Sequence, residues 1–523
     1  MMHLNSFFFF LLIILTTITN CFSQPAGSLD PTFNSVGYVR TAIGNSVDVG
    51  SKVMVQSDGK ILVAGISHMG NYNGFALVRY NTNGSIDNTF NGNGKVSIHA
   101  GDNNYDDNLT SAALQSDGKI VLAGYSNTGT LKKVTLVRFN SNGTIDTSFD
   151  GDGIVKTSVG NFDNYATSIK ILSSGKILVA GYYLDDFGAD LFCLLKYNSN
   201  GSLDNTFDAD GKVSTQILYT ENRANDLAVQ GDGKIIVAGQ LLNNSNFDHD
   251  IAIVRYNSNG SLDSSFDGDG KVITDIAGNG EWVYSAGIQS DGKILVGGKT
   301  YNGSDYDILI VRYNVDGSLD NTFNGNGIVV EDIDNSDNMA YSLSIQSDQK
   351  IIISGVTGYS PSNTETDFVV LRYNADGSID GSFGNSGIVQ TNLGGSMDAA
   401  VSCAIQNDGK ILVAGRTNFT SVFDFDFALA RYLENTVEIQ EVLNDSQWNI
   451  FPNPTCDAVT IADNLNEITK IDVYNIQGEL VYQQLNFFSN TLKIDLSCNP
   501  AGLYIFNLYT TEKSFRNKVT LIK

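Results

Sequence analysis

The sequence predicts an all-β protein, a seven-bladed β-propeller of four-stranded blades followed by a small C-terminal β-sandwich. One unit of about 58 residues recurs seven times, and a fixed period of this order is typical of solenoids, propellers and arrays. Each unit contains four short strand patterns and no segment with the 3.6-residue period of a helix. The units begin with the motif G(S/T)(L/I)D at Gly27, Gly84, Gly143, Gly201, Gly260, Gly317 and Gly377.

The strands of one unit can be placed from its turns. In the first full unit, strand-like runs over 53–56 and 60–64 are joined by the tripeptide SDG, and runs over 75–80 and 95–99 follow. A three-residue connection that ends in Gly fits a type I turn followed by a left-handed residue. Six units have this Gly, whereas the remaining unit has Gln349. Gln349 must therefore adopt a strained left-handed conformation or use another turn.

The first strand of each unit is apolar or small on both faces. In the first unit Val53 and Val55 lie on one face and Met54 on the other, and the fifth unit has Gly287 at the position of Met54. A strand covered on both faces belongs between two sheets. Blades arranged radially meet this requirement and leave only short edges.

The two ends of the repeat array complement each other. Residues 37–43 form a strand pattern of the fourth type that has no earlier strands to pair with, and the seventh unit ends near Leu433 without its fourth strand. The N-terminal strand can fill this vacancy. The sequence therefore predicts a propeller over 27–433 whose ring is closed by its own N-terminal strand.

The N-terminus predicts export. Residues 1–23 contain an uncharged apolar run and then small residues that fit cleavage after Ser23, as in a signal peptide. The run is short for a spanning helix, and nothing later resembles one, so we expect no transmembrane anchor. Cysteines are few for an exported chain: Cys193 and Cys403 fit core positions. Cys456 and Cys498 share the C-terminal segment and could pair in an oxidising compartment.

The charge balance limits the class of partner. The chain carries 57 acidic and 32 basic residues, a formal net charge of −25. An acidic surface repels phosphate backbones and anionic lipid, so we expect no nucleic-acid partner. Cations and polar neutral ligands suit it better.

The repeated unit resembles the delta-60 repeat family of bacterial seven-copy β-propellers. The matching residues are QSDGKILVAG around Asp58, the dipeptide Arg79-Tyr80, and NGSIDNTFNGNG from Asn83. The resemblance covers residues 27–433 and implies the fold only, because the family has no established catalytic residues to carry over.

The C-terminal segment is a different module. A polar linker over 434–446 precedes a domain over 447–523, whose alternating apolar runs and turn glycines fit a β-sandwich. Its FPNP opening, YNIQGELV hairpin and PAGLY motif resemble the type A C-terminal sorting domain of the type IX secretion system. That resemblance implies the type IX machinery as a partner. It also implies a protein secreted from, or held on the outer surface of, a Gram-negative bacterium.

Antiparallel connectivity sorts the propeller loops by rim. The (D/S)GK turns and G(S/T)(L/I)D connectors lie on one rim, which we call the repeated rim. The second-to-third strand loops and the blade-to-blade loops lie on the other, the variable rim, and variable loops on rigid scaffolds commonly carry function. Aromatic rings beside carboxylates suit sugars or partner proteins, although the rings could simply cover blade edges. The candidate ligand-binding residues are Tyr105, Tyr165, Tyr182, Tyr183, Trp282, Tyr301, Tyr306, Asp185 and Asp186.

A ring of seven acids or amides stands where the chain enters each first strand. These side chains could surround the channel mouth and hold a cation through oxygen ligands, or each could cap its own turn, which we favour. Connectors such as DGDG faintly resemble calcium loops, but other copies have lost the charges, so we expect no cofactor, with Ca2+ the one alternative. The ring positions are Asp48, Asp107, Asn164, Asn222, Glu281, Asn338 and Asp398.

One basic residue and one Asp recur in every blade and predict a structural ion pair. A charge repeated seven times is poor evidence for a single active site. The pairs are Arg79 with Asp87, Arg138 with Asp146, Lys196 with Asp204, Arg255 with Asp263, Arg312 with Asp320, Arg372 with Asp380 and, across the ring closure, Arg431 with Asp30.

Catalytic motifs are absent from the sequence. The four His residues lack ligand spacing, and there is no HExxH, G-x-S-x-G or paired CxxC. We therefore expect a monomeric, non-enzymatic binding module for a glycan or protein. A carbohydrate-active enzyme with carboxylates at the channel mouth and a structural surface component are the alternatives.

Overall fold

The structure is a computed structural model. It describes residues 24–44, 46–102, 105–218, 220–245, 247–359, 365–418, 424–434, 449–462, 468–475, 480–485, 491–509 and 514–522. The chain divides into two compact units, Met1–Val437 and Glu438–Lys523. The predicted signal peptide and nearly all of the predicted linker lie outside the described residues.

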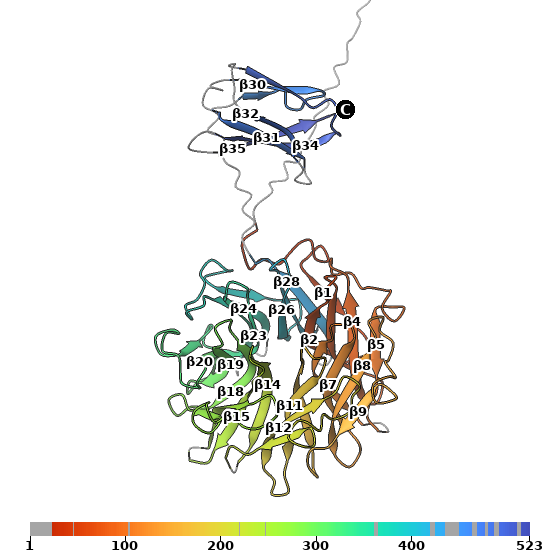
Figure 1. Ribbon diagram of the computed structural model, residues 1–523, viewed down its shortest axis with the longest axis vertical. Helices are drawn as coiled ribbons and strands as arrows, with labels where there is room; N and C mark the ends of the chain where they lie inside the picture. Colours follow the sequence, from red (N-terminus) through yellow and green to blue (C-terminus); the bar gives the residue numbers. More distant parts are fainter. Residues whose placement is uncertain are drawn as a thin grey trace, which may run out of the picture. The chain divides into compact units, whose positions relative to one another are not determined.

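Seven four-stranded antiparallel sheets form the first unit and are arranged as blades around a centre (Figure 1). Within six of these blades the strands follow one another in space as they do in the sequence. The first three complete blades are β2 (Asp48–Val55), β3 (Ile61–His68), β4 (Asn73–Tyr80) and β5 (Lys95–Ile98); β6 (Asp107–Leu114), β7 (Ile120–Asn127), β8 (Lys132–Phe139) and β9 (Ile154–Thr157); and β10 (Asn164–Ile171), β11 (Ile177–Leu184), β12 (Asp190–Tyr197) and β13 (Lys212–Thr215).

The next three blades repeat this order, and the seventh draws its strands from both ends of the chain. They are β14 (Asn222–Val229), β15 (Ile235–Asn243), β16 (Asp248–Tyr256) and β17 (Lys271–Thr274); β18 (Glu281–Ile288), β19 (Ile294–Tyr301), β20 (Tyr306–Tyr313) and β21 (Ile328–Glu331); β22 (Asp337–Ile345), β23 (Ile351–Tyr359), β24 (Asp367–Tyr373) and β25 (Ile388–Thr391); and β26 (Asp398–Ile405), β27 (Ile411–Asn418) and β28 (Phe425–Tyr432) with β1 (Tyr38–Thr41).

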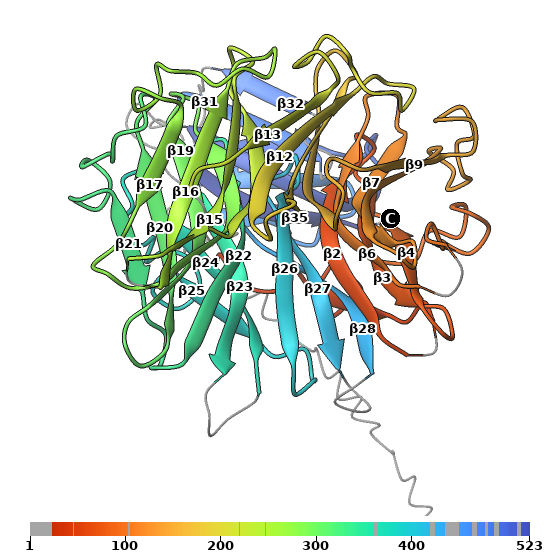
Figure 2. The same ribbon diagram turned by 90° about the horizontal axis from the view of Figure 1, so that it is seen from below.

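The predicted ring closure is confirmed. β1 pairs antiparallel with β28 in the register Tyr38↔Ala430 to Thr41↔Phe427. Figure 1 shows this N-terminal strand beside the blue β28, and Figure 2 shows β26, β27 and β28 side by side. The seventh blade is therefore completed by a strand almost 400 residues away in the sequence.

The first strand of every blade is innermost and contacts the first strands of both neighbouring blades. Each of these strands carries a β-bulge at the same position, as between Val283 and Ser285 in β18. Bulges bend a strand and free backbone groups from the ladder. Several freed N–H groups donate to the preceding blade, as Leu343 does to the Ser285 hydroxyl at 3.1 Å. The bulge thus connects adjacent blades beside the central axis.

The hairpin between the first two strands behaves as its sequence predicts. The six turn glycines have φ between 79° and 87°, and Gln349 takes the left-handed conformation with φ of 71°. The Gln349 N–H still donates to the Gln346 carbonyl at 2.9 Å. This hairpin of the sixth blade therefore keeps the common turn and accepts the strain of a side chain at a glycine position.

The recurrent ion pair is present in all seven blades. In the six pairs with arginine, the Nε atom lies 2.7–2.9 Å from the aspartate, and the guanidinium lies 4.4–4.6 Å from the centroid of a buried Phe ring. The same arginine reaches the next blade, as Arg79 donates to the Ser141 carbonyl at 2.6 Å. In the remaining blade, Lys196 lies 3.9 Å from Asp204. The network is structural and joins neighbouring blades.

The aspartates of these ion pairs allow a prediction of how the stability of the propeller depends on pH. Burial alone would raise the pKa of Asp204, but hydrogen bonds from Lys176 and Thr206 and the charge of Lys176 lower it to about 2. A carboxyl whose pKa is lowered by folding binds its proton at lower pH than in the unfolded chain. The Asp204 carboxylate therefore makes its full contribution to the free energy of unfolding above about pH 4, and this contribution declines as the pH falls toward 2.

Urea unfolding at pH 7, 5, 3.5 and 2.5 measures this effect. We expect similar midpoints at pH 7 and 5 and a steep decline below pH 4. Asp204→Asn should show a smaller decline than the parent, because one such carboxyl is gone. Equal midpoints at pH 5 and 2.5 would contradict the assignment.

The C-terminal unit consists of two antiparallel sheets with one shared apolar core. The sheets are β29 (Asn449–Phe451), β30 (Ala458–Ala462) and β33 (Thr491–Asp495), and β32 (Leu480–Leu485), β31 (Lys470–Asn475), β34 (Gly502–Tyr509) and β35 (Ser514–Leu521). All four described cysteines are free thiols, buried at Cys193 and Cys403 and exposed at Cys456 and Cys498. Among the residues described, no helix has the length and apolarity to cross a membrane.

Candidate functional site: the variable rim

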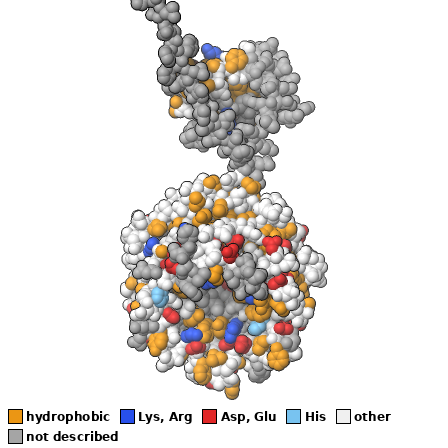
Figure 3. Space-filling view, turned by 180° about the vertical axis from the view of Figure 1, so that it is seen from behind, with side chains coloured by type: hydrophobic (Ala, Val, Ile, Leu, Met, Phe, Trp, Pro, Cys, Tyr) orange, Lys and Arg blue, Asp and Glu red, His pale blue; other side chains and the backbone are white. Residues whose placement is uncertain are grey.

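Exposed aromatic side chains gather on one rim of the propeller. Among its described residues, five large aromatic side chains are more than a third exposed, and all five lie in or beside variable-rim loops. The exposed apolar residues near the repeated rim are aliphatic, such as Val36 and Val315. Figure 3 shows the face that carries the histidines, with hydrophobic, basic and acidic side chains around its centre. The exposed aromatics are Tyr105, Phe162, Phe187, Phe247 and Tyr301.

Two predicted tyrosines meet at the junction of the second and third blades. The rings of Tyr165 in β10 and Tyr182 in β11 stack with centroids 4.7 Å apart, because the strand register places these residues opposite each other. Tyr125 from β7 packs edge-on against Tyr165 at 4.8 Å. The Lys132 ammonium donates to the Tyr165 hydroxyl at 2.9 Å, and the Arg223 guanidinium lies 5.6 Å from the Tyr182 centroid. We call Tyr125, Tyr165 and Tyr182 the tyrosine cluster.

A second set of rings surrounds Trp282 at the start of β18. Tyr306 lies edge-on to Trp282 at 5.3 Å, and Tyr301 lies 5.3 Å from Tyr306. The imidazole of His249, from the preceding blade, lies 5.0 Å from Trp282. We call these four residues the tryptophan cluster.

A lysine lies against the tryptophan cluster. The Lys299 ammonium lies 3.6 Å from the Tyr306 centroid and 5.0 Å from that of Trp282. Burial lowers the pKa of Lys299, while the charge of Asp337 opposes this. A cation over ring faces is favourable by about 0.5–2 kcal/mol. The cluster therefore combines apolar ring faces with a positive charge.

The other predicted ligand-binding residues are not brought into these clusters. Tyr105 is exposed near Gly129, and Tyr183 packs against the blade core beside Gly160. Asp185 caps its own loop by accepting from the Phe187 and Ala189 N–H groups, each at 2.8 Å. Asp186 accepts from the Asn161 amide at 3.1 Å. The two aspartates thus hold loop conformations.

Sequence reasoning missed the two most exposed aromatics of the rim. Phe187 is 95% and Phe247 77% exposed. Both lie in otherwise polar loops, within the sequences DDFGAD and NSNFDHD. A Phe whose sequence neighbours are Asp, Asn and Gly has no apolar neighbours in its loop with which to form a core. This contrast in polarity could have predicted that both rings are exposed.

The seven acids and amides lie at the start of the first strand of each blade and are fully buried. Asp48 accepts from the Ile43 N–H at 2.6 Å, Asn164 from the Val159 N–H at 2.8 Å, and Asp398 from the Leu393 N–H at 2.6 Å. Asp107 likewise accepts from the Ala100 N–H at 2.7 Å. These are the contacts of side chains that cap the blade-to-blade turns. These buried oxygens thus hold the backbone of the turns that lead into the first strands.

Family comparison identifies both parts of the chain. Residues 449–523 match the secretion system C-terminal sorting domain. Seven segments match the β-propeller domain of unknown function DUF5122: 56–90, 115–149, 172–207, 230–266, 289–323, 346–383 and 406–435. The comparison with curated proteins returns no significant match.

Several solved structures are similar to this chain at low identity. A catalytically inactive virginiamycin B lyase from Staphylococcus aureus is 12% identical, with 75% of this chain and 98% of that chain covered and a TM-score of 0.41. A polysaccharide lyase of family PL25, an ulvan lyase, is 13% identical, with 77% and 96% covered and a TM-score of 0.42. The β-propeller domain of the trilobed protease from Pyrococcus furiosus is 9% identical, with 73% and 93% covered and a TM-score of 0.38. Likenesses this distant carry no argument about activity.

Proposed function

We propose that this chain, built from seven repeats of the DUF5122 β-propeller family and exported through its type IX sorting domain, is a non-enzymatic binding module. It acts outside the cell or on its surface, and the variable rim is its binding face. The observation that carries the proposal is that, among the described residues of the propeller, the exposed aromatic side chains lie in or beside the loops of that rim. Exposed rings that serve no packing role mark interaction sites.

A glycan is the ligand class that the rim fits best. Ring faces such as those of Trp282 and Tyr301 offer flat apolar platforms, and nearby amides and carboxylates such as Asp305 offer hydrogen bonds. Sugars present one apolar face and a rim of hydroxyl groups, so they use both. The exposed Phe187 and Phe247 extend the same surface.

The buried state of the ring carboxylates supports binding over catalysis. Glu281, the residue that an enzyme hypothesis would use, is fully buried and accepts from the Ile276 N–H and the Thr300 hydroxyl, each at 3.2 Å. A general acid must reach the atom that it protonates. A glycan at the rim surface would not meet this carboxyl.

Glycan-array binding of the full chain tests the proposal. We expect a restricted set of glycans to bind, and Trp282→Ala and Phe187→Ala to weaken binding of the same set about tenfold or more, because truncated aromatic anchors dominate such interfaces. Val315→Ala, which truncates an exposed apolar residue near the repeated rim, serves as the control and should bind as the parent does.

Incubation of the bound glycans with the protein separates binding from turnover. Unchanged glycans support the binding module. Product formation that is lost in Glu281→Gln would overturn it in favour of a carbohydrate-active enzyme. A folded chain that binds no glycan or protein and assembles in quantity on the cell surface would instead indicate a structural component.

A further inference from the structure

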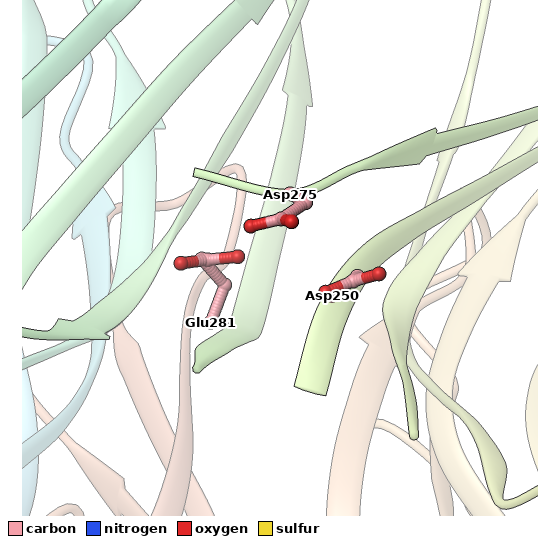
Figure 4. Close-up of side chains that lie close together, drawn as sticks. All are labelled: Asp250, Asp275 and Glu281. Carbon is pink, nitrogen blue, oxygen red and sulfur yellow. The ribbon is translucent and has the colours of Figure 1, made fainter. Parts of the chain in front are cut away.

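Three carboxylates from different elements converge at the junction of the fourth and fifth complete blades. Asp250 lies on β16, Asp275 directly follows β17, and Glu281 begins β18 of the next blade. One oxygen of each lies within 4.8 Å of one oxygen of each of the others. Figure 4 shows the three carboxyl groups gathered around one point, with one oxygen of Asp250 directed toward the other two. The convergence depends on the packing of two blades.

Asp250 is the least satisfied member of this group. Its side chain is 1% exposed, and its Oδ2 atom accepts from the Asn243 amide at 2.9 Å. Its Oδ1 atom is buried and, within the described part of the chain, has no hydrogen-bond partner. A buried carboxylate oxygen without a donor costs free energy unless a cation satisfies it.

The charges of the group repel one another. Burial raises the pKa of Glu281 to about 8, and the carboxylates of Asp275 and Asp250 add to that rise, against hydrogen bonds from Ile276 and Thr300. Burial also raises the pKa of Asp250, and the charge of Asp275 adds to it. A positive ion between these oxygens would reverse the repulsion.

The other blade junctions provide an internal comparison. At each of them, at least one of the three equivalent positions lacks a carboxyl group. At each of the next three junctions, one position holds an amide or an alanine. At the junction before the second complete blade, the Nδ1 atom of His99 lies 3.0 Å from the Oδ2 atom of Asp107. The equivalent sets are Asp307, Asp332 and Asn338; Asp367, Asn392 and Asp398; Asp426, Ala42 and Asp48; Gly74, His99 and Asp107; Lys133, Ser158 and Asn164; and Leu191, Gln216 and Asn222.

We propose that Asp250, Asp275 and Glu281 form a binding site for one calcium ion that joins these two blades. The three ligands are hard oxygens, with no nitrogen or sulfur donor, which favours Ca2+ over Zn2+. Calcium takes oxygen ligands at 2.3–2.6 Å, so two ligands of one ion can stand up to about 5 Å apart, in agreement with the observed spacing. Asp275 is exposed, which leaves room for the water ligands that complete the coordination.

Calorimetric titration of the full chain with CaCl2, after treatment with EDTA and removal of the chelator, tests the site. We expect one ion per chain with a dissociation constant of about 10⁻⁴–10⁻³ M, the range of extracellular calcium modules. In thermal melts, 10 mM CaCl2 should raise the propeller transition by about 2 °C relative to NaCl of equal ionic strength. The proposal would be overturned if the parent protein gave no heat of binding on titration with CaCl2. It would also be overturned if NaCl of equal ionic strength raised the melting temperature equally.

Two isosteric variants locate the ion. Asp250→Asn and Glu281→Gln should each weaken calcium binding about tenfold or more. Both should lose the calcium-dependent increase in melting temperature. Asp367→Asn changes the equivalent strand position at a junction that already has Asn392, and should bind calcium as the parent does. Unchanged affinity in both isosteric variants would place the ion elsewhere and overturn this assignment.

Discussion

Deleting residues 27–45 is expected to abolish the cooperative unfolding of the propeller. The deletion removes β1 and with it the pairing of four residues with β28. It also removes Asp30, which accepts from the buried Arg431 at 2.9 Å, and leaves the Tyr80 hydroxyl without Thr41, its partner at 2.8 Å. A buried charge that loses its partner costs about 3–5 kcal/mol, a large part of the 5–15 kcal/mol that stabilises a typical domain. The buried Phe33 is lost as well.

Circular dichroism and urea unfolding of the deleted chain measure this effect. A chain that ends after Val437 provides the control, because it removes the second compact unit and leaves every blade intact. It should unfold at the midpoint of the parent propeller. A separate peptide of residues 24–45 should restore the transition when added to the deleted chain. A deletion protein that melts like the parent would show that β1 is not needed for closure.

Replacing Arg312 by Ala is expected to give the largest loss among single substitutions, about 3–5 kcal/mol. Arg312 is 5% exposed, and its Nε atom lies 2.7 Å from Asp320. It also covers the Phe323 ring at 4.5 Å and donates to the Ala375 carbonyl of the next blade. Ala removes all three contacts and leaves a buried carboxylate, for which Lys293 at 2.9 Å compensates only in part.

Arg312→Lys is the control, because one blade already has a lysine at this position. Lys196 keeps the link to the next blade, a bond to the Ser258 carbonyl at 3.0 Å, but lies 3.9 Å from Asp204. The lysine variant should therefore lose clearly less stability than the alanine variant in urea unfolding. Equal losses would mean that the planar guanidinium contacts carry the stability, and an alanine variant as stable as the parent would refute the structural role of the pair.

The fold was predictable because its signals are local and recur seven times. The turn glycines and the two-faced apolar first strands are read directly from the sequence, and the left-handed Gln349 is one of the two outcomes that its position allowed. Closure by β1 followed from counting strands at the two ends of the array. The C-terminal sorting domain was recognisable because its motifs keep their order and spacing.

The candidate site was predictable only in outline. Repetition and variation pointed to the rim on which the exposed aromatic side chains of the described propeller residues lie, and two predicted tyrosines, Tyr165 and Tyr182, do stack. The aspartates of the same loops bond their own backbone or a neighbouring amide instead. The conformation of a loop decides which side chain projects into solvent and which one hydrogen-bonds to the loop backbone. Each variable loop occurs only once, so the sequence has no repeat from which to infer that conformation.

By itself, the sequence determined the class of fold, the number of blades, the closing strand and the route of export. Each of these depends on residues that recur in every repeat or that belong to a recognisable motif. Only the tertiary structure decided which side chains meet across blades. Asp250, Asp275 and Glu281 belong to three different elements, and their equivalents recur in every repeat with other chemistry. Strand periodicity tells on which face and near which rim a residue lies, whereas the distance between carboxylates is set by how two sheets pack. At these three positions the seven similar units therefore form junctions of different chemistry.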